Sequence, residues 1–382
     1  MKILFLARGI PSENDPQEGC FEWDQAKALL TLGHIPIVMA LDAKRRKERR
    51  KWGITHFTKE GIEVYRIYGG TTTIVEHLIS YKLALKINNF LTEHLYKRVI
   101  TEHPDIKLIH AHYLRCISRA AIIGKKYNMP VVGTEHWSEI IRKDISKKIY
   151  SMGMSSYRNI DKLICVSEYL QKAIANKYNV NSVVCGNVLS TEFIDTYISS
   201  DRKASDIFSF ISCGSLVPIK GYDIIIKAAA KLTIPRNKWK MEIIGGGPLR
   251  KELQALIDNL GLHDNIILKG QLEKRDIVDA LRQSDTFVLG SRSETFGVVV
   301  IEALAMGVPV ICTRCGGTDG LINKNNGQYI PIDDVEAMKD AMEYAYNNNQ
   351  TYDRNRIRED CLERFSPTAI ANKLIKIYNY VI

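Results

Sequence analysis

Short apolar runs alternate with helix-length amphipathic segments along almost the whole chain. The apolar runs predict strands at 2–7, 35–40, 63–68, 108–112, 130–136, 162–167 and 182–187, and again at 208–215, 240–246, 265–270, 285–291 and 309–314. Segments such as Glu22 to Leu32 and Cys116 to Tyr127 have the helical period. Two successive series of strand and helix predict an α/β protein with two doubly wound domains.

The polar, charged stretch 199–205 has no apolar period, and it predicts the break between the domains. We therefore expect an N-terminal domain over 1–200 and a C-terminal domain over 201–366. The final segment, 367–382, is predicted to be a helix that packs back on the first domain.

The stretch from 293 to 307 predicts a short buried helix that ends at Gly307, a typical residue just beyond a helix C-terminus. Glu302 lies inside this helix with apolar residues on both sides. Removing an unpaired carboxylate from water costs roughly several kcal/mol, so Glu302 requires a partner. A ligand is one candidate for that partner, and a helix cap or an ion pair is the alternative.

Composition is that of an ordinary globular protein. The 382 residues exceed what one core usually serves, and 45% are hydrophobic and 25% charged. No window approaches the roughly 18 consecutive apolar residues of a membrane helix, and no small-residue cleavage site follows the first apolar run. These features predict a cytoplasmic protein whose N-terminus forms a buried strand.

The net charge of +10 is concentrated in the first half of the chain. Residues 1–200 contain 29 Lys and Arg against 20 Asp and Glu, which gives +9 and leaves +1 for the remainder. The basic residues gather at 44–51 and, beside isoleucines, at 140–149. Solvated faces are one interpretation; the other is a surface that meets anionic lipid headgroups at the inner face of the membrane, or an acidic acceptor. No nucleic-acid motif accompanies the charge, so no nucleic-acid partner is expected.

The eight cysteines lie mostly inside apolar runs, which is typical of reduced core thiols. Cys312 and Cys315 form a C-x-x-C pair. No second pair follows at zinc-site spacing, so we expect neither a zinc site nor a redox site there.

Distinctive residues gather at the predicted strand ends, where parallel sheets bind their ligands. The segments that carry these residues are 19–34, 110–113, 134–136, 161–170 and 187–189, followed by 214–223, 244–250, 293–311 and 316–322. In this order they resemble the retaining GT-B glycosyltransferases of family 4. The most specific element is the pair Glu294 and Glu302, with seven residues between them, downstream of the Lys-Gly dipeptide at 220–221.

The resemblance implies two Rossmann-like domains that face each other across a cleft, with the acceptor on the first and the nucleotide-diphosphate sugar on the second. It implies a retaining, metal-independent hexosyl transfer to a glycan or lipid-linked acceptor in cell-surface polysaccharide synthesis. No cofactor and no metal are expected, and no Asp-x-Asp motif ends a predicted strand.

The resemblance also assigns roles to residues. His136, Lys220 and Glu294 are the expected catalytic residues, with Lys220 and the helix start supplying positive charge to the leaving diphosphate. Glu302 is expected to bind the ribose hydroxyls. The remaining expected donor-binding residues are Gly19, Ser215, Gly246, Gly247, Leu272, Phe296, Gly297 and Val298. Ser215 stands where many members carry an arginine, and Arg250 or Arg292 are candidates to compensate.

Structural interpretations remain open beside these roles. Glu294 also suits a helix N-terminus, His136 a satisfied strand end, and Gly19 an ordinary turn. His110 and His112 share one face of a strand and fit packing or an acceptor-side role. A sugar-nucleotide epimerase, a phosphorylase or a binding module on the same architecture are the alternative functions.

Overall fold

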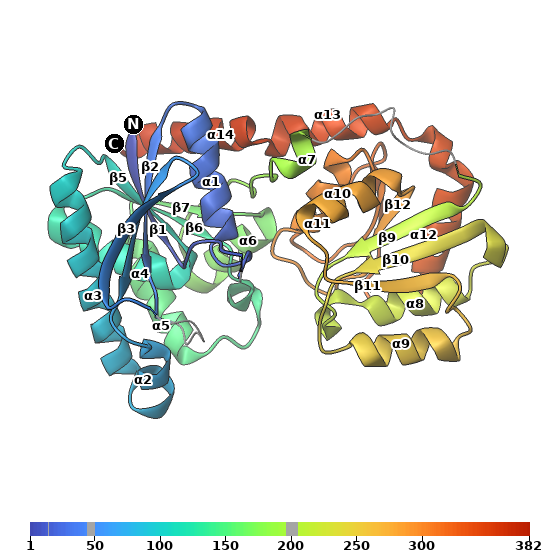
Figure 1. Ribbon diagram of the computed structural model, residues 1–382, viewed down its shortest axis with the longest axis horizontal. Helices are drawn as coiled ribbons and strands as arrows, with labels where there is room; N and C mark the ends of the chain where they lie inside the picture. The colour runs from blue at the N-terminus through green and yellow to red at the C-terminus, as the bar shows by residue number, and fades with distance from the viewer. Residues whose placement is uncertain (14, 44–49, 196–204) are drawn as a thin grey trace. The chain divides into compact units, whose positions relative to one another are not determined.

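The computed structural model describes residues 1–13, 15–43, 50–195 and 205–382. The chain forms two compact units, Met1–Val188 with Pro367–Ile382, and Leu189–Ser366 (Figure 1). Most of the basic stretch 44–51 and of the expected break at 199–205 lies outside the described residues.

The second unit begins at Leu189, before the expected boundary at 200. The Leu189 amide donates to the Phe365 carbonyl at 2.9 Å. The guanidinium of Arg358 donates to the carbonyls of Phe193 at 3.0 Å and Ile194 at 2.8 Å. These hydrogen bonds attach the start of the second unit to its helix α13 (Arg354–Phe365).

The first unit contains an eight-stranded sheet in the order β3-β4-β2-β1-β5-β6-β7-β8. Its strands are β1 (Lys2–Ala7), β2 (Ile35–Leu41), β3 (Gly53–Lys59), β4 (Ile62–Tyr68), β5 (Leu108–His112), β6 (Val131–Glu135), β7 (Lys162–Cys165) and β8 (Val183–Val184). All pairs are parallel except β3 with β4. The central strand β1 is almost fully buried from Ile3 to Ala7, because helices cover both faces of the sheet.

Helices between the strands, together with the last helix of the chain, complete the first unit. They are α1 (Cys20–Thr31), α2 (Thr72–Leu78), α3 (Tyr81–Glu102), α4 (Tyr113–Tyr127), α5 (Lys147–Ser156), α6 (Glu168–Tyr178) and α14 (Pro367–Val381), with the 3-10 turns η1 (Ser138–Ile141) and η2 (Tyr157–Asn159). The last helix, α14, packs on α1.

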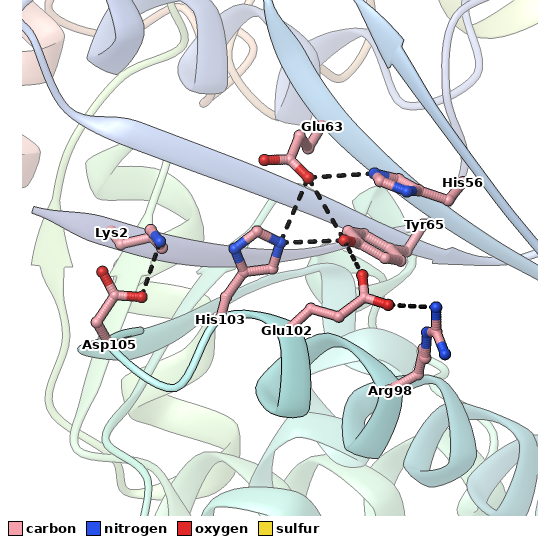
Figure 2. Close-up of polar contacts among 8 residues, drawn as sticks. All are labelled: Lys2, His56, Glu63, Tyr65, Arg98, Glu102, His103 and Asp105. Carbon is pink, nitrogen blue, oxygen red and sulfur yellow. Dashed lines mark hydrogen bonds and ion pairs between the residues drawn. The ribbon is translucent and has the colours of Figure 1, made fainter.

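A polar cluster joins the edge of this sheet to the end of α3 (Figure 2). The Tyr65 hydroxyl donates to Glu102 at 2.5 Å and lies 3.0 Å from Nε2 of His103. Glu63 accepts from His56 at 3.1 Å across the antiparallel pair. The cluster thus links α3 to β4 and the outer strand β3.

The second unit contains a fully parallel six-stranded sheet in the order β11-β10-β9-β12-β13-β14. Its strands are β9 (Phe208–Cys213), β10 (Trp239–Ile244), β11 (Ile266–Gly270), β12 (Thr286–Leu289), β13 (Val310–Thr313) and β14 (Gly327–Ile330). Its helices are α7 (Glu192–Asp195), α8 (Tyr222–Ala230), α9 (Arg250–Asn259), α10 (Lys274–Gln283), α11 (Val298–Ala305), α12 (Val335–Asn348) and α13 (Arg354–Phe365).

The predicted short buried helix is confirmed as α11, and Gly307 follows it with φ of 69°. Val300, Ile301 and Leu304 are buried in this helix. Among the described residues, no helix combines the length and the apolar character that crossing a bilayer requires.

Candidate functional site

The carboxyl edge of the second sheet brings Lys220 and Glu294 into contact. Nζ of Lys220 lies 2.6 Å from Oε1 of Glu294, and the hydroxyl of Ser291 donates to the same oxygen at 2.7 Å. The side chains of Lys220 and Glu294 are 21% and 12% exposed. Two residues that are 74 positions apart in the sequence therefore form a largely buried ion pair.

Close backbone packing fixes this pair. A Cβ atom on Gly221, whose φ is 64°, would lie 1.9 Å from the carbonyl oxygen of Gly290. The Arg292 amide donates to the Ile219 carbonyl at 2.7 Å. The loop after β9, which carries Lys220, is thereby held against the loop after β12, which carries Glu294.

The N-terminus of α11, at Val298, follows Glu294 after a three-residue segment. Glu294 pairs with Gly316 in an isolated parallel bridge, and its carbonyl accepts from the Gly317 amide at 3.1 Å. Gly297 precedes the helix with φ of 92°, and a Cβ atom there would lie 2.7 Å from Cγ2 of Thr318. The first-turn amides, beginning at Val298, point to the same edge and carry the positive end of the helix dipole.

Glu302 lies in the second turn of α11 and is half-buried. Burial, with a smaller contribution from the Glu302 carboxylate, raises the pKa of Cys213 at the end of β9 to about 12. Phe296 is buried and packs edge-on against Phe365, with ring centroids 5.6 Å apart. Phe296 therefore stabilises the start of α11 from the core side.

The remaining predicted donor-site residues line the neighbouring loops. The carbonyl of Gly246 accepts from the Leu216 amide at 2.9 Å, and a Cβ atom on Gly247 would lie 2.5 Å from the Leu216 carbonyl oxygen. Ser215 is exposed between these contacts, and Leu272 is half-buried after β11. Both loops end at the same edge of the sheet as Lys220.

The two arginines considered as substitutes for the missing cation have partners within the unit. Arg292 binds Asp223 at 3.0 Å and Asp333 at 2.7 Å. Arg250 donates to the Leu268 carbonyl at 2.8 Å. These contacts hold both guanidinium groups against other parts of the second unit.

The first unit places His136 in a buried aromatic cluster at the end of β6. Its ring lies between Phe21, with centroids 5.4 Å apart, and Tyr113, with centroids 4.8 Å apart. Nε2 of His136 is 3.1 Å from Nδ1 of His112. His136 is 6% exposed, so its ring is almost completely enclosed.

The other two histidines extend this cluster into the core. The rings of His110 and His112 are 4.3 Å apart, which confirms that they share a face. His110 lies 2.7 Å from Thr134 and 2.7 Å from the Tyr378 hydroxyl on α14. Burial lowers the pKa of His110 to about 3 and the pKa values of His112 and His136 well below the usual value, so all three are neutral near pH 7.

Gly19 precedes α1 with φ of 70°, and a Cβ atom there would lie 2.2 Å from the Gly9 carbonyl oxygen. The backbone thus requires a glycine at this position, independently of any ligand. Beside it, Arg8 binds Glu22 at 3.0 Å, and its guanidinium carbon lies 3.5 Å from the centre of the Tyr113 ring. Neither Arg8 nor Tyr113 was predicted from the sequence as a site residue. Arg8 could have been found, because it is a charged residue directly after the first predicted strand.

Cys312 and Cys315 are both buried free thiols. Burial raises the pKa of each, and the Cys315 sulfur lies 3.4 Å from the Thr318 hydroxyl. Thiols in this state are poor nucleophiles and poor metal ligands, as expected for structural core residues.

Comparison with known proteins identifies the family. The family model for glycosyl transferases group 1 matches residues 193–360, and the model for glycosyltransferase family 4 matches residues 23–192. The chain belongs to the family 4 type of GT-B glycosyltransferases.

Individual relatives match most or all of this chain. The chain is 26% identical to the putative teichuronic acid biosynthesis glycosyltransferase TuaC of Bacillus subtilis, and the match covers 100% of this chain and 97% of the relative. It is 22% identical to a subunit of the phosphatidylinositol N-acetylglucosaminyltransferase of Saccharomyces cerevisiae, over 96% of this chain and 81% of the relative.

Solved structures share the fold. Sucrose-phosphate synthase from Thermosynechococcus elongatus superposes with a TM-score of 0.75 at 17% identity, covering 99% of this chain and 98% of that protein. Anabaena HepE, solved in complex with UDP and glucose, superposes with a TM-score of 0.71 at 19% identity over both full chains. The predicted GT-B fold, with two Rossmann-like α/β domains, is confirmed.

Proposed function

We propose that this glycosyltransferase moves a hexose from a nucleotide-diphosphate sugar to a hydroxyl of a glycan or lipid-linked acceptor, in the synthesis of a cell-surface polysaccharide. The observation that carries the proposal is the buried pair of Lys220 and Glu294 beside the N-terminus of α11. The names of TuaC and of the phosphatidylinositol glycosyltransferase support the acceptor class, and the HepE complex supports a nucleotide donor.

The second unit would hold the donor. Departure of the nucleotide diphosphate develops negative charge on the leaving oxygens, and Lys220 together with the first-turn amides of α11 would stabilise that charge. Glu302 would accept hydrogen bonds from the ribose hydroxyls. Glu294, held by Lys220 and Ser291, would orient hydroxyls of the donor sugar.

The remaining site residues would complete the binding surface. Gly246, Gly247 and Leu272 would line the nucleotide, and Ser215 the diphosphate. Phe296 would shape the sugar pocket. In the first unit, His136 would contact the donor sugar and Gly19 would approach the diphosphate. His136 directly follows the carboxyl end of β6, and its place at the edge where parallel sheets bind their ligands supports a ligand contact.

The transfer is proposed to retain the anomeric configuration and to need neither a metal ion nor a cofactor. In this path the acceptor hydroxyl attacks from the face that the diphosphate leaves, and a leaving phosphate oxygen takes its proton. Sugar-nucleotide epimerisation and phosphorolysis are less well supported, because the relatives described above are named for glycosyl transfer.

Donor hydrolysis tests this proposal without knowledge of the acceptor. A panel of uridine, guanosine and adenosine diphosphate sugars, incubated with and without EDTA, should contain one donor from which the enzyme releases the free sugar. Proton NMR, recorded before mutarotation, should show the donor's own anomer first. Release of the opposite anomer would exclude retention, and loss of activity in EDTA would exclude metal independence.

The proposed membrane contact at the inner face of the cell membrane involves α2 and the first half of α3. Large apolar side chains are exposed there, with Ile74 at 42%, Leu78 at 80%, Ile79 at 69%, Leu83 at 43% and Phe90 at 69%. Helix α2 follows the carboxyl end of β4, at the sheet edge that also carries His136. A bilayer on this surface would bring a lipid-linked acceptor to that edge.

Basic residues accompany the apolar surface. Lys82 and Lys86 are exposed on α3, and Lys148 of α5 reaches Glu76 of α2 at 3.6 Å. The predicted basic surface at 140–149 exposes little of its isoleucine side chains, because Ile140 is buried and the three other isoleucines are half-buried. The lipid-facing apolar side chains would therefore come from α2 and α3.

Vesicle sedimentation tests this contact. The double substitution Leu78→Asp and Ile79→Asp should abolish sedimentation with vesicles that contain phosphatidylglycerol, because it places charge in the hydrocarbon boundary. Ile35→Asp, at the opposite end of the sheet and 50% exposed, is the control and should bind like the wild type. Equal binding by all three proteins would refute the surface.

A further inference from the structure

Glu135 is a buried carboxyl group to which the proposed reaction assigns no role. It is the last residue of β6, it precedes His136, and it is 0% exposed. A buried carboxyl group is costly unless several donors satisfy it. Its partners therefore indicate why this position is acidic.

Several donors converge on Glu135, including the backbone amide of Leu114 on α4. The amides of His136 and Trp137 donate to its Oε1 at 3.0 and 2.9 Å. The Tyr157 hydroxyl donates to Oε2 at 2.6 Å. An ionised carboxylate can accept from all of these donors at once.

The packing around Tyr157 fixes the donor in place. Tyr157 is 2% exposed, and its ring meets that of Tyr178 edge-on at a centroid distance of 5.1 Å. Tyr178 in turn occupies the space that a side chain on Gly153 would need, because a Cβ atom there would lie 2.4 Å from Cε1 of Tyr178. Tyr157 is thus a rigid support for Glu135.

We propose that Glu135, held by Tyr157, is a positioning residue that fixes the main chain of His136 and so orients the imidazole between Phe21 and Tyr113. The value of this orientation for catalysis rests on the proposed contact between His136 and the donor sugar. The orientation itself does not depend on that contact.

Ionisation of Glu135 couples this support to pH. Burial raises the pKa of Glu135 to about 7, and hydrogen bonds from the Tyr157 hydroxyl and from the amides of Trp137, His136 and Leu114 partly offset that rise. Because the folded-state pKa lies above the usual value, the buried group is protonated below about pH 7 and ionised above it. This arrangement of donors therefore belongs to the ionised form and weakens as the pH falls through about 7.

Other titratable groups face Glu135 from every neighbouring element. Burial raises the pKa values of Tyr113 and Cys116 on α4, Tyr157 on η2, Cys165 on β7 and Tyr178 on α6, so they stay neutral near pH 7. The neighbouring histidines are neutral as well, because burial lowers their pKa values. Within the described part of the chain, Glu135 is the group in this cluster expected to change its charge near neutral pH.

The test follows the His136 imidazole by NMR in the full chain with ¹⁵N-labelled histidine, with the signal assigned by its loss in His136→Gln. The wild-type signal should shift between two positions with a midpoint near pH 7 while the imidazole stays neutral. Tyr157→Phe should move the midpoint to higher pH, because it removes a hydrogen bond that favours the carboxylate.

Two variants of similar size separate positioning from general stability. Glu135→Gln keeps an acceptor for the two amides, so the signal should stay at its high-pH position without a transition. Glu135→Leu removes the acceptor and should displace the signal at every pH. The proposal is overturned if the wild type shows no transition, if Glu135→Gln keeps it, or if Glu135→Leu leaves the signal at the wild-type position.

These outcomes do not depend on turnover. If His136→Ala keeps full donor hydrolysis while the pH-linked shift is present, the catalytic role of His136 is wrong and the positioning by Glu135 stands. If hydrolysis requires His136 but the shift is absent, the proposed function survives and the positioning is wrong.

Discussion

Replacing Lys220 with alanine is expected to lower donor turnover by about 100- to 1,000-fold, the usual cost of removing one preorganised charge-stabilising group. Lys220 is held 2.6 Å from Glu294 and is only 21% exposed, so its ammonium group is already positioned before the donor binds. Arg250 and Arg292, the candidates to compensate for Ser215, have partners in the unit. Steady-state rates of nucleotide release would measure the loss.

Lys227→Ala provides the matched control for this prediction. Lys227 lies on α8, is 49% exposed and pairs with Asp223 at 3.6 Å. Its removal should change turnover less than about twofold, since exposed ion pairs contribute little. Equal losses in both variants would indicate a general effect of lysine removal, and full activity in Lys220→Ala would disprove the catalytic role.

Replacing Glu302 with alanine is expected to weaken donor binding by about 30-fold, which corresponds to about 2 kcal/mol of charge-assisted hydrogen bonding. The carboxylate is half-buried on α11, one and a half turns beyond the glycine that opens the helix. Calorimetric titration with the intact donor that the hydrolysis panel identifies would give the dissociation constant. Glu359→Ala on α13, with a side chain that is 64% exposed, should bind the donor normally. Unchanged affinity in Glu302→Ala would contradict the ribose contact.

The sequence pattern predicts the buried strands and the edge strands β8 and β11, but it misses the other two edge strands. Strands such as β1 and β5 match the predicted ranges, because an apolar run buried on both faces has no competing interpretation. The edge strands β3 and β14 were missed. Most of β3 is exposed or half-buried, and β14 has only four residues, so neither forms a continuous apolar run.

The predicted residues of the second unit were recoverable because they follow one another at strand ends in a recognisable order. The structure brings Lys220 and Glu294 together, although no spacing rule in the sequence could predict their ion pair. The roles of Glu135 and Tyr157 could not be predicted either. Their contact joins residues 22 positions apart on different elements, and a lone tyrosine before a strand gives no signal.

The most direct test of the central claim is a thermal-shift panel of nucleotide-diphosphate sugars with EDTA present, run on the wild type and on Glu302→Ala. Binding stabilises the native state by about 2.7 kcal/mol when the ligand is at 100 times its dissociation constant. A uridine or guanosine diphosphate sugar should raise the melting temperature of the wild type without metal, and Glu302→Ala should lose this rise. If no sugar nucleotide raises the melting temperature while NAD or a nucleic acid does, the proposed donor site is wrong.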